Sequence, residues 1–498
     1  MEWFWAALSL IVFLSLLHQL LKKEKKREAN LPPSPIALPV IGHLHLLGKN
    51  LPLKLHAIAE RHGPIVFLRL GLVRALVVST AAGAELVLKT HDLVFSGRVH
   101  HQASRYLGYD QKNIVFAPYG AYWRNMRRLC MVKLLNAAKI NEFRPVRRAE
   151  LEETVASMRR AAEERGVVDV SAVISGVIGD MNSLMVFGRK YVDRDLDEEL
   201  GFKAVIDEML HVGALPNLGD FFPFMAALDL QGLDRRMKEL SKIFDGFLER
   251  IIDDHLLKKT ENTKKGDFVD TMLAVMEAGE ADFEFDRRHV KAVLLDMLIA
   301  GMDTSASTVE WALSELIRHP EITKKLQKEL EQVVGMDQMV DESHLDKLDY
   351  LDSVLKETLR LYPPGRLLVH ETMEECTVNG FHIPKGTWTF VNMWSIGRDP
   401  AMWHEPEKFV PERFAGENLD FLGQNFKFIP FGAGRRSCPG LQLGLTFVRL
   451  VLAQLVHCFD WELPNGMVPS DLDMNEKFGI VTSRDKHLMA IPTYRLNK

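Results

Sequence analysis

Residues 431–440 constrain what this chain can fold into more than any other segment does. The segment reads Phe-Gly-Ala-Gly-Arg-Arg-Ser-Cys-Pro-Gly and places Cys438 directly before an apolar stretch, residues 441 to about 459, which predicts a long helix. Pro439 falls in the first-turn position that proline tolerates. The free N–H groups and the dipole at a helix start favour a thiolate over a thiol. The segment therefore predicts a cysteine anchored at the beginning of a buried helix.

The residues around this cysteine suit a flat, charged cofactor. Gly434 and Gly440 allow the backbone to approach a ligand closely, and Arg436 offers a charge that a carboxylate can pair with. With Phe431, the segment resembles the haem-binding signature of the cytochrome P-450 monooxygenases. The resemblance implies haem b, with Cys438 as the iron ligand and the other four residues against the cofactor. The alternative is a buried structural cysteine in a glycine-rich loop.

Composition predicts one large globular body. The chain has 498 residues, 47% of them hydrophobic, and no Gly/Ser-rich or Pro-rich break in its middle. A net charge of −5 gives no sign of nucleic-acid binding. The four cysteines form no CxxC pair, which argues against a disulfide framework and a zinc site.

The pattern of apolar residues predicts a mostly α fold with a small β region, an α+β class that the resemblance also implies. Amphipathic stretches predict helices over 147–164, 232–257, 286–318 and 321–334. Strand-like segments cover 65–78 and 376–391, and Asn379-Gly380 indicates a hairpin in the second.

The N-terminus predicts a membrane anchor. Residues 3–21 are almost all apolar and long enough to cross a bilayer, and a basic cluster follows at 22–27. We expect an anchor helix over 1–21, a basic and proline-rich hinge over 22–42, and a cytosolic catalytic domain over 43–498. The resemblance implies the endoplasmic reticulum membrane. A cleaved signal peptide is the alternative.

A second motif lies at residues 300–304, Ala-Gly-Met-Asp-Thr, inside the predicted helix 286–318. Gly, Asp and Thr are poor residues for a helix interior. Thr304 can turn its hydroxyl onto the carbonyl four residues back and bend the helix. The motif matches the oxygen-activation segment of the family, in which Thr304 would donate a hydrogen bond and Asp303 would pass protons inward. A kink without chemistry is the alternative.

Glu357 and Arg360 share one helix face at spacing i, i+3, and Arg413 offers a second guanidinium downstream. Such pairs are usually solvated surface features. In the family they would form a buried triad under the cysteine loop and hold it in place.

The remaining cofactor contacts come from the resemblance. Trp123 and Arg127, at spacing i, i+4, would meet one haem propionate, and His370 would meet the other. The chain departs from the family before His370, because the segment is one residue short and Arg366 replaces a common proline. These changes put the role of His370 in doubt.

The resemblance is to plant microsomal members of the large specialised-metabolism clan. It implies insertion of one oxygen atom from O2 into a small hydrophobic metabolite such as a terpenoid, flavonoid or other phenolic. Electrons would come from NADPH through a separate NADPH–cytochrome P-450 reductase, since the chain has no flavin or nicotinamide fingerprint. Phe116, Ala300, Leu368 and Ile480 are the candidate pocket residues. The alternatives are a haem-thiolate isomerase or dehydratase and a non-catalytic membrane haem- or lipid-binding protein.

Overall fold

The structure is a computed structural model that describes residues 30–48, 50–190, 202–258, 266–417 and 419–497. Its α-helices are α2 (Leu51–His62), α3 (Ala81–Glu85), α4 (Gln102–Leu107), α5 (Ala121–Lys133), α6 (Ala137–Glu142), α7 (Arg144–Glu163), α8 (Val170–Phe187), α9 (Phe202–Ala214), α10 (Leu218–Phe221), α11 (Leu233–Lys258), α12 (Phe268–Ala278), α13 (Arg287–Arg318), α14 (Pro320–Val334), α15 (Asp349–Leu361), α16 (Met393–Ile396) and α17 (Leu441–Cys458). Its strands are β1 (Ile65–Leu70), β2 (Val73–Val78), β3 (Val168–Asp169), β4 (Leu367–Glu371), β5 (Cys376–Val378), β6 (Phe381–Ile383), β7 (Trp388–Asn392), β8 (Phe459–Glu462), β9 (Glu476–Lys477), β10 (Ser483–Arg484) and β11 (Met489–Tyr494).

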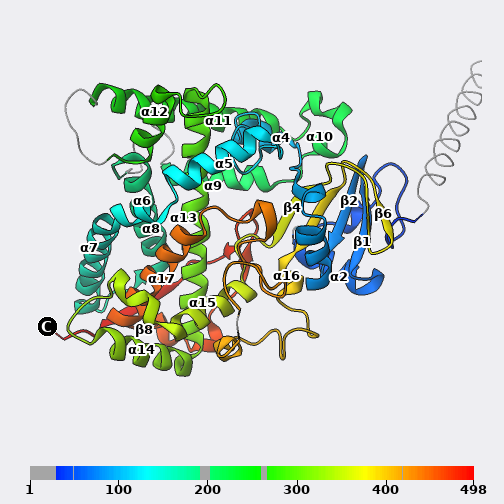
Figure 1. The fold of residues 1–498 in the computed structure, drawn as a ribbon. Coiled ribbons are helices and arrows are strands. Elements are labelled where there is room, and N and C mark those ends of the chain that lie inside the picture. Colours follow the sequence, from blue (N-terminus) through cyan, green and yellow to red (C-terminus); the bar gives the residue numbers. More distant parts are fainter. Residues whose placement is uncertain (1–29, 49, 191–201, 259–265, 418, 498) are drawn as a thin grey trace, which may run out of the picture.

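Helix α13 forms the centre of the molecule and packs against α8 and α17 (Figure 1). It begins at Asp286, whose side chain accepts a hydrogen bond from the His289 N–H in a capping box. Its buried residues surround the helix rather than forming one stripe, as expected for a helix covered on all sides. The predicted helices over 286–318 and from 441 are thus present, with ends within a residue or so of the expected ones. The mostly α, α+β prediction is confirmed.

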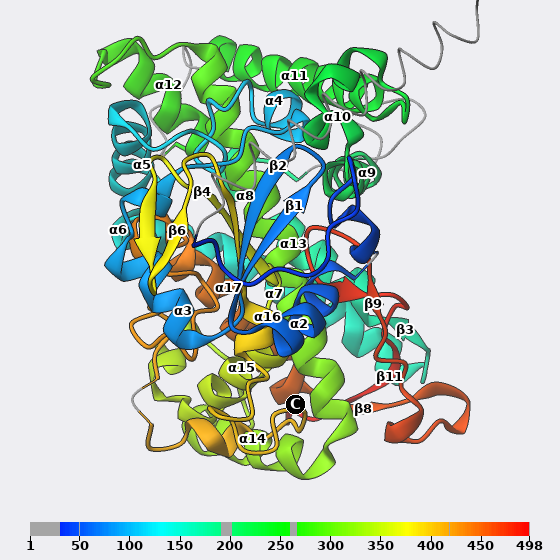
Figure 2. The same cartoon turned by 90° about the vertical axis from the view of Figure 1, so that its right-hand side faces the viewer.

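The main sheet has four strands in the order β1-β2-β7-β4, with β2 and β7 parallel and the other pairs antiparallel. It lies to one side of the helical part in Figure 1 and faces the viewer in Figure 2. β5 and β6 form the predicted hairpin, in which Asn379 and Gly380 take φ values of 50° and 81°. Positive φ at both positions is what a type I′ turn needs.

The predicted anchor over 1–21 and the first part of the hinge lie outside the described residues. Residues 30–37 of the hinge have no regular structure, and residues 38–42 form a tight turn closed by a bridge between Leu38 and Gly42. This stretch packs along β1, where the Phe67 N–H donates to Pro33 O at 2.9 Å and Gly42 bridges Leu70. This proline-rich stretch is therefore attached to the folded body over the length that the structure describes.

Three described helices, α8, α13 and α17, are long and apolar enough to cross a membrane by length and composition. More than half of each apolar stretch is buried inside the protein. The packing of α13 against both of the others accounts for this apolar surface.

Candidate active site

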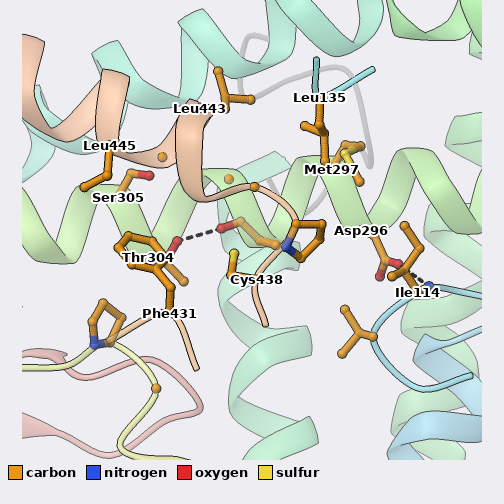
Figure 3. A pocket seen from close by; sticks show the side chains of 18 of the residues that line it. Ile114, Leu135, Asp296, Met297, Thr304, Ser305, Phe431, Cys438, Leu443 and Leu445 are labelled. Atoms are coloured by element: carbon orange, nitrogen blue, oxygen red, sulfur yellow. Dashed lines mark hydrogen bonds between the residues drawn. The ribbon is translucent and has the colours of Figure 1, made fainter. Parts of the chain in front are cut away.

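A cavity of about 320 Å³ lies between α5, α13 and the start of α17. Cys438 and Thr304 both line it, as do Phe431, Ala300 and Gly440 (Figure 3). Most of its remaining wall is apolar and includes Ile114, Leu135, Met297, Leu443, Leu445 and Val448. The chain thus brings the cysteine loop and the 300–304 motif to one space.

Cys438 is exposed, and this exposure is toward the cavity that it lines. Its N–H donates to Phe431 O at 2.9 Å, which closes the loop before α17. Burial raises the pKa of the thiol, because desolvation outweighs the backbone hydrogen bond at Gly440 and the charge of Arg127, which both lower it. The helix start alone therefore does not produce a thiolate, whereas a bound metal ion deprotonates a coordinating thiol outright.

Gly434 serves a different purpose from the one expected. Its φ is +69°, and a Cβ there would lie 2.3 Å from the carbonyl oxygen of Leu88. Glycine is required because the loop turns left-handed and touches the 86–90 segment. Gly434 does not line the cavity, so its expected close approach to the cofactor is corrected to packing against the protein's own backbone.

Three guanidinium groups lie in the cavity wall with no carboxylate beside them. Arg98, Arg127 and Arg436 line the cavity, and none forms an ion pair within the part of the chain that the structure describes. Arg436 donates to Ser96 O at 2.8 Å and Ala117 O at 2.7 Å, and its Nη1 is buried without a partner. Burial and the neighbouring cations lower the pKa of Arg98 to about 10 and that of Arg436 to about 9.

These cations fit a cofactor that carries carboxylates. Buried positive charges need a counter-charge, and a buried guanidinium N–H needs an acceptor. Haem b has two propionates and an iron that a thiolate can hold, so Cys438 and the three arginines together suit it. Arg98 was missed from the sequence, where Phe95-Ser-Gly-Arg98 carries no local signal of a cofactor contact.

Trp123 supports this cluster with its ring rather than with its N–H. The indole N–H donates to Ile114 O at 3.0 Å, so it is already occupied. The ring lies 4.1 Å from the guanidinium carbon of Arg436 and 5.5 Å from that of Arg127. The ring is thus a cation–π platform for the two arginines, and the contact of Trp123 with a propionate stays a prediction.

His370 is buried on β4, and its Nδ1 lies 2.8 Å from Phe95 O. Since a carbonyl only accepts, Nδ1 carries the hydrogen. Burial and the charges of Arg98 and Arg436 hold the pKa of His370 well below its ordinary value. The predicted contact of His370 with a propionate stays a prediction.

Thr304 makes the hydrogen bond expected from the sequence, from Oγ1 to Ala300 O at 2.6 Å. Next to it, Asn182 of α8 donates to Met297 O and Leu298 O at 3.2 and 3.0 Å. A Cβ on Gly301 would lie 2.9 Å from the Asn182 side-chain oxygen, so only glycine leaves room for this contact. Two side chains, the threonine hydroxyl and an amide from another helix, thus hydrogen-bond to α13 carbonyls at the motif, and α13 is continuous from Arg287 to Arg318.

Asp303 points away from Thr304 into a second cavity of about 430 Å³. This cavity is polar and lies between α9, α13 and the β9–β10 turn, with Lys203, Asp207, His211, Glu310, Lys477 and Arg484 in its wall. Burial and the charge of Asp207 raise the pKa of Asp303 to about 6, against the lowering effects of Lys203 and Lys477. Helix α13 therefore lies between the cavity lined by Cys438, called the cysteine cavity below, and this polar cavity. Thr304 lines the first cavity and Asp303 lines the second.

The four predicted pocket residues do not share one cavity. Ala300 lines the cysteine cavity, whereas Phe116 and Leu368 line an adjoining cavity that shares Arg98 and Arg436 with it. Ile480 is 48% exposed and lines the polar cavity. Ile114 lines the cysteine cavity, and Val115 lines both this cavity and the adjoining one.

Glu357, Arg360 and Arg413 meet as the resemblance implied. Glu357 and Arg360 are fully buried, with Arg360 Nε 2.6 Å from Oε2, and Arg413 Nε lies 2.9 Å from Oε1. The guanidinium of Arg360 also donates to the carbonyls of Gly397, Pro406 and Lys408. The three charges are thus satisfied on all sides, which a buried network requires.

This network holds the 397–410 segment and lies beside the residues that lead into the cysteine loop. Arg360 lines one small cavity together with Phe428 and Pro430. The ring of Trp403 lies 5.3 Å from the Arg360 guanidinium carbon. Trp403 in turn packs on Phe414, whose ring centre is 5.2 Å from that of Phe428.

The fold and this site define a class of haem protein with a cysteine thiolate ligand. The cytochrome P-450 family model matches residues 32–489. The chain is 46% identical over 478 residues to cytochrome P-450 CYP736A12 of Panax ginseng, covering 95% of each chain. It is 41% identical over 476 residues to the flavonoid 3'-monooxygenase CYP75B137 of Crocosmia x crocosmiiflora, covering 94% of this chain and 93% of the relative.

A solved structure of a zebra fish cytochrome P-450 with progesterone has the same fold, with a TM-score of 0.75 and 26% identity over 89% of this chain and 99% of that one. The chain belongs to the cytochrome P-450 family. It is a haem-thiolate monooxygenase whose cofactor is haem b. The resemblance seen in the sequence is confirmed.

Proposed function

We propose that this protein inserts one oxygen atom from O2 into a C–H bond of a small hydrophobic specialised metabolite, a terpenoid, flavonoid or other phenolic. The observation that carries this proposal is the largely apolar cavity lined by both Cys438 and Thr304. A relative that shares 41% identity is named for its action on a flavonoid.

Cys438 would hold the iron, and Arg98, Arg127 and Arg436 would bind the two propionates. Haem bound through a thiolate supplies electron density that favours cleavage of the O–O bond. His370 lies beside this cluster, and burial and the charges of Arg98 and Arg436 lower its pKa. The ring of Trp123 keeps two of the three guanidinium groups in place.

Thr304 and Asp303 would deliver protons from opposite sides of α13. The Thr304 hydroxyl lies in the cavity and is oriented by the carbonyl of Ala300. Asp303 faces a polar cavity and has a pKa of about 6, so it exchanges protons readily near neutral pH. This placement favours a monooxygenase over an isomerase or dehydratase, which consumes no protons from solvent, and over a non-catalytic haem or lipid carrier.

Electrons would arrive from NADPH through NADPH–cytochrome P-450 reductase, since the chain itself carries no nicotinamide or flavin fingerprint. We also propose a single-pass anchor in the endoplasmic reticulum membrane, with the catalytic domain in the cytosol. Exposed apolar side chains support a membrane-facing surface beside the hinge. They are Ile36, Val40, Leu72, Phe224, Leu228 and Leu230. Backbone hydrogen bonds from Gly71 to Ile41 and from Leu72 to Phe221 join these segments.

The experiment is a carbon monoxide difference spectrum of the reduced protein, followed by turnover with reductase and NADPH on a panel of terpenes, flavonoids and simple phenolics. We expect the thiolate-type spectrum and an oxygenated product that incorporates one atom of labelled O2. Product formation without NADPH or O2 would favour the isomerase alternative. A thiolate-type spectrum without any turnover on the panel would contradict the proposed substrate class.

A further inference from the structure

Asp296 is a buried carboxylate in the wall of the cysteine cavity that none of the roles above uses. It lies on α13, two turns before Thr304, and is 7% exposed. Among the described residues it forms no ion pair. Its Oδ1 accepts from Asn113 Nδ2 at 2.7 Å, and its Oδ2 accepts from the Ile114 N–H at 2.7 Å (Figure 3). One carboxylate therefore accepts hydrogen bonds from two donors of a single segment.

That segment, residues 108–117, does not hold its shape by local preference. Tyr109, Asp110 and Gln111 have φ values of 52°, 53° and 59°. Each of these non-glycine residues thus adopts the left-handed conformation, which costs conformational free energy at every position. Contacts with other parts of the molecule must stabilise the segment.

Carbonyl groups of the same segment accept hydrogen bonds from Trp123 and from two cations of the cofactor site. Ile114 O accepts from Trp123 Nε1, Val115 O from Arg98 Nε at 2.9 Å, and Ala117 O from Arg436 Nη2 at 2.7 Å. The N–H groups of the segment thus bind Asp296, and its carbonyls bind the residues that face the propionates. A displacement of the segment would move both sets of contacts together.

We propose that Asp296 is a positioning residue that holds the 108–117 segment in place. Through the carbonyl groups of that segment, Asp296 also positions Arg98 and Arg436, which form the cofactor edge of the proposed haem site. The inference rests on the proposed haem site. It assigns to Asp296 no contact with haem or substrate. It also explains why an uncompensated carboxylate is kept in a largely apolar wall, where a neutral residue would be expected.

The test compares three variants of the haem-loaded enzyme. Asp296→Asn places an amide donor against the donors of the segment. Asn113→Ala removes one of the hydrogen bonds and leaves the carboxylate intact. The matched control is Asp110→Asn, which removes the exposed ion pair between Asp110 and Arg288 of the same segment and the same helix. Asparagine also tolerates the left-handed φ of position 110.

Three measurements are made, one on the segment and two on the cofactor edge. Hydrogen exchange of the peptide amides at 112–117 reports on the segment, and the rate of haem transfer to apomyoglobin and the ferric/ferrous midpoint potential report on the cofactor edge. In Asp296→Asn we expect both rates to rise about ten-fold or more, since hydrogen bonds to a charged group are lost. The potential is compared in Asn113→Ala, because Asp296→Asn also removes a negative charge near the cofactor, which by itself raises the potential. In Asn113→Ala the potential should become more negative as cations move away from the cofactor, and both rates should rise by less than in Asp296→Asn. Asp110→Asn should leave all three quantities at wild-type values.

Unchanged amide exchange in Asp296→Asn would overturn the proposal. Faster exchange with wild-type haem transfer in Asp296→Asn, together with a wild-type potential in Asn113→Ala, would overturn the link to the cofactor edge. If Asp296→Asn does not fold, the same outcomes measured in Asn113→Ala support or overturn the proposal. The carbon monoxide spectrum of the wild-type protein checks the haem site independently, so that a failure of the proposed function is distinguishable from a failure of this inference.

Discussion

Replacing Glu357 by glutamine should destabilise the protein while preserving side-chain volume. The substitution leaves two guanidinium groups, of Arg360 and Arg413, without the carboxylate that lies 2.6 to 2.9 Å from them. Both Glu357 and Arg360 have no exposed side-chain surface, so water cannot take the place of the charge. Breaking such a buried pair costs about 3–5 kcal/mol.

The unfolding entropy of about 2.1 cal/mol/K per residue amounts to roughly 1 kcal/mol/K for a chain of 498 residues. A loss of about 3–5 kcal/mol therefore lowers the midpoint temperature by about 3–5 °C. The measurement is far-UV circular dichroism on heating, with haem content read in parallel from the carbon monoxide spectrum. We expect less haem incorporated per protein, because the 397–410 segment and the aromatic contacts leading to the cysteine loop lose their support.

The matched control is Glu405→Gln, in the same segment. Glu405 pairs with Lys408 at 2.5 Å, but both side chains are largely exposed. Its midpoint should equal that of the wild type. If Glu357→Gln also melted at the wild-type midpoint and kept its haem, the triad would be no more important than a surface pair, and the reasoning from burial would be refuted.

Cys438→His should abolish the red-shifted Soret band of the ferrous carbonyl that a thiolate ligand produces, and survival of that band would exclude Cys438 as the ligand. Thr304→Ala should keep haem and substrate binding but release hydrogen peroxide and form less product per NADPH; full coupling would leave Thr304 a purely structural role. Burial raises the pKa of Asp296 to about 7, above the usual value of about 3.9 in an unfolded chain. The folded protein thus binds more protons, so its stability falls as pH rises from about 4 to about 7, by about 4 kcal/mol for this group. Asp296→Asn should flatten that slope in urea unfolding measured at several pH values, and an equal slope would contradict the raised pKa. Deletion of residues 1–30 should release much of the protein from membranes with its haem spectrum intact; loss of haem would make the segment part of the fold.

Local sequence patterns predicted the structural features that depend only on residues close together in the chain. The helix over 286–318 was evident because its apolar residues continue for several turns, and the hairpin at Asn379-Gly380 because only certain residues accept positive φ. The hydrogen bond from Thr304 to Ala300 follows from helix geometry alone. Each of these features is decided within a few residues, so the sequence carries its full signal.

Contacts between distant segments gave no such signal. Asn182 reaches Met297 O across 115 positions, and Asp296 reaches Asn113 across 183. Arg98 likewise acts through partners on other elements. Nothing in their own surroundings distinguishes them from ordinary core or surface residues, because the partner is chosen by how α5, α8 and α13 pack.

The sequence by itself determined the class of the protein, since the cysteine loop, the 300–304 motif and the triad are short patterns of residue types at set spacings. Only the tertiary structure decided where those residues point. It placed Thr304 and Asp303 in different cavities on two sides of one helix, kept the pKa of the Cys438 thiol high, and gathered three guanidinium groups without a counter-charge. Solvation, the pairing of charges and the choice of cavity depend on which surfaces are brought together, and a linear pattern does not specify them.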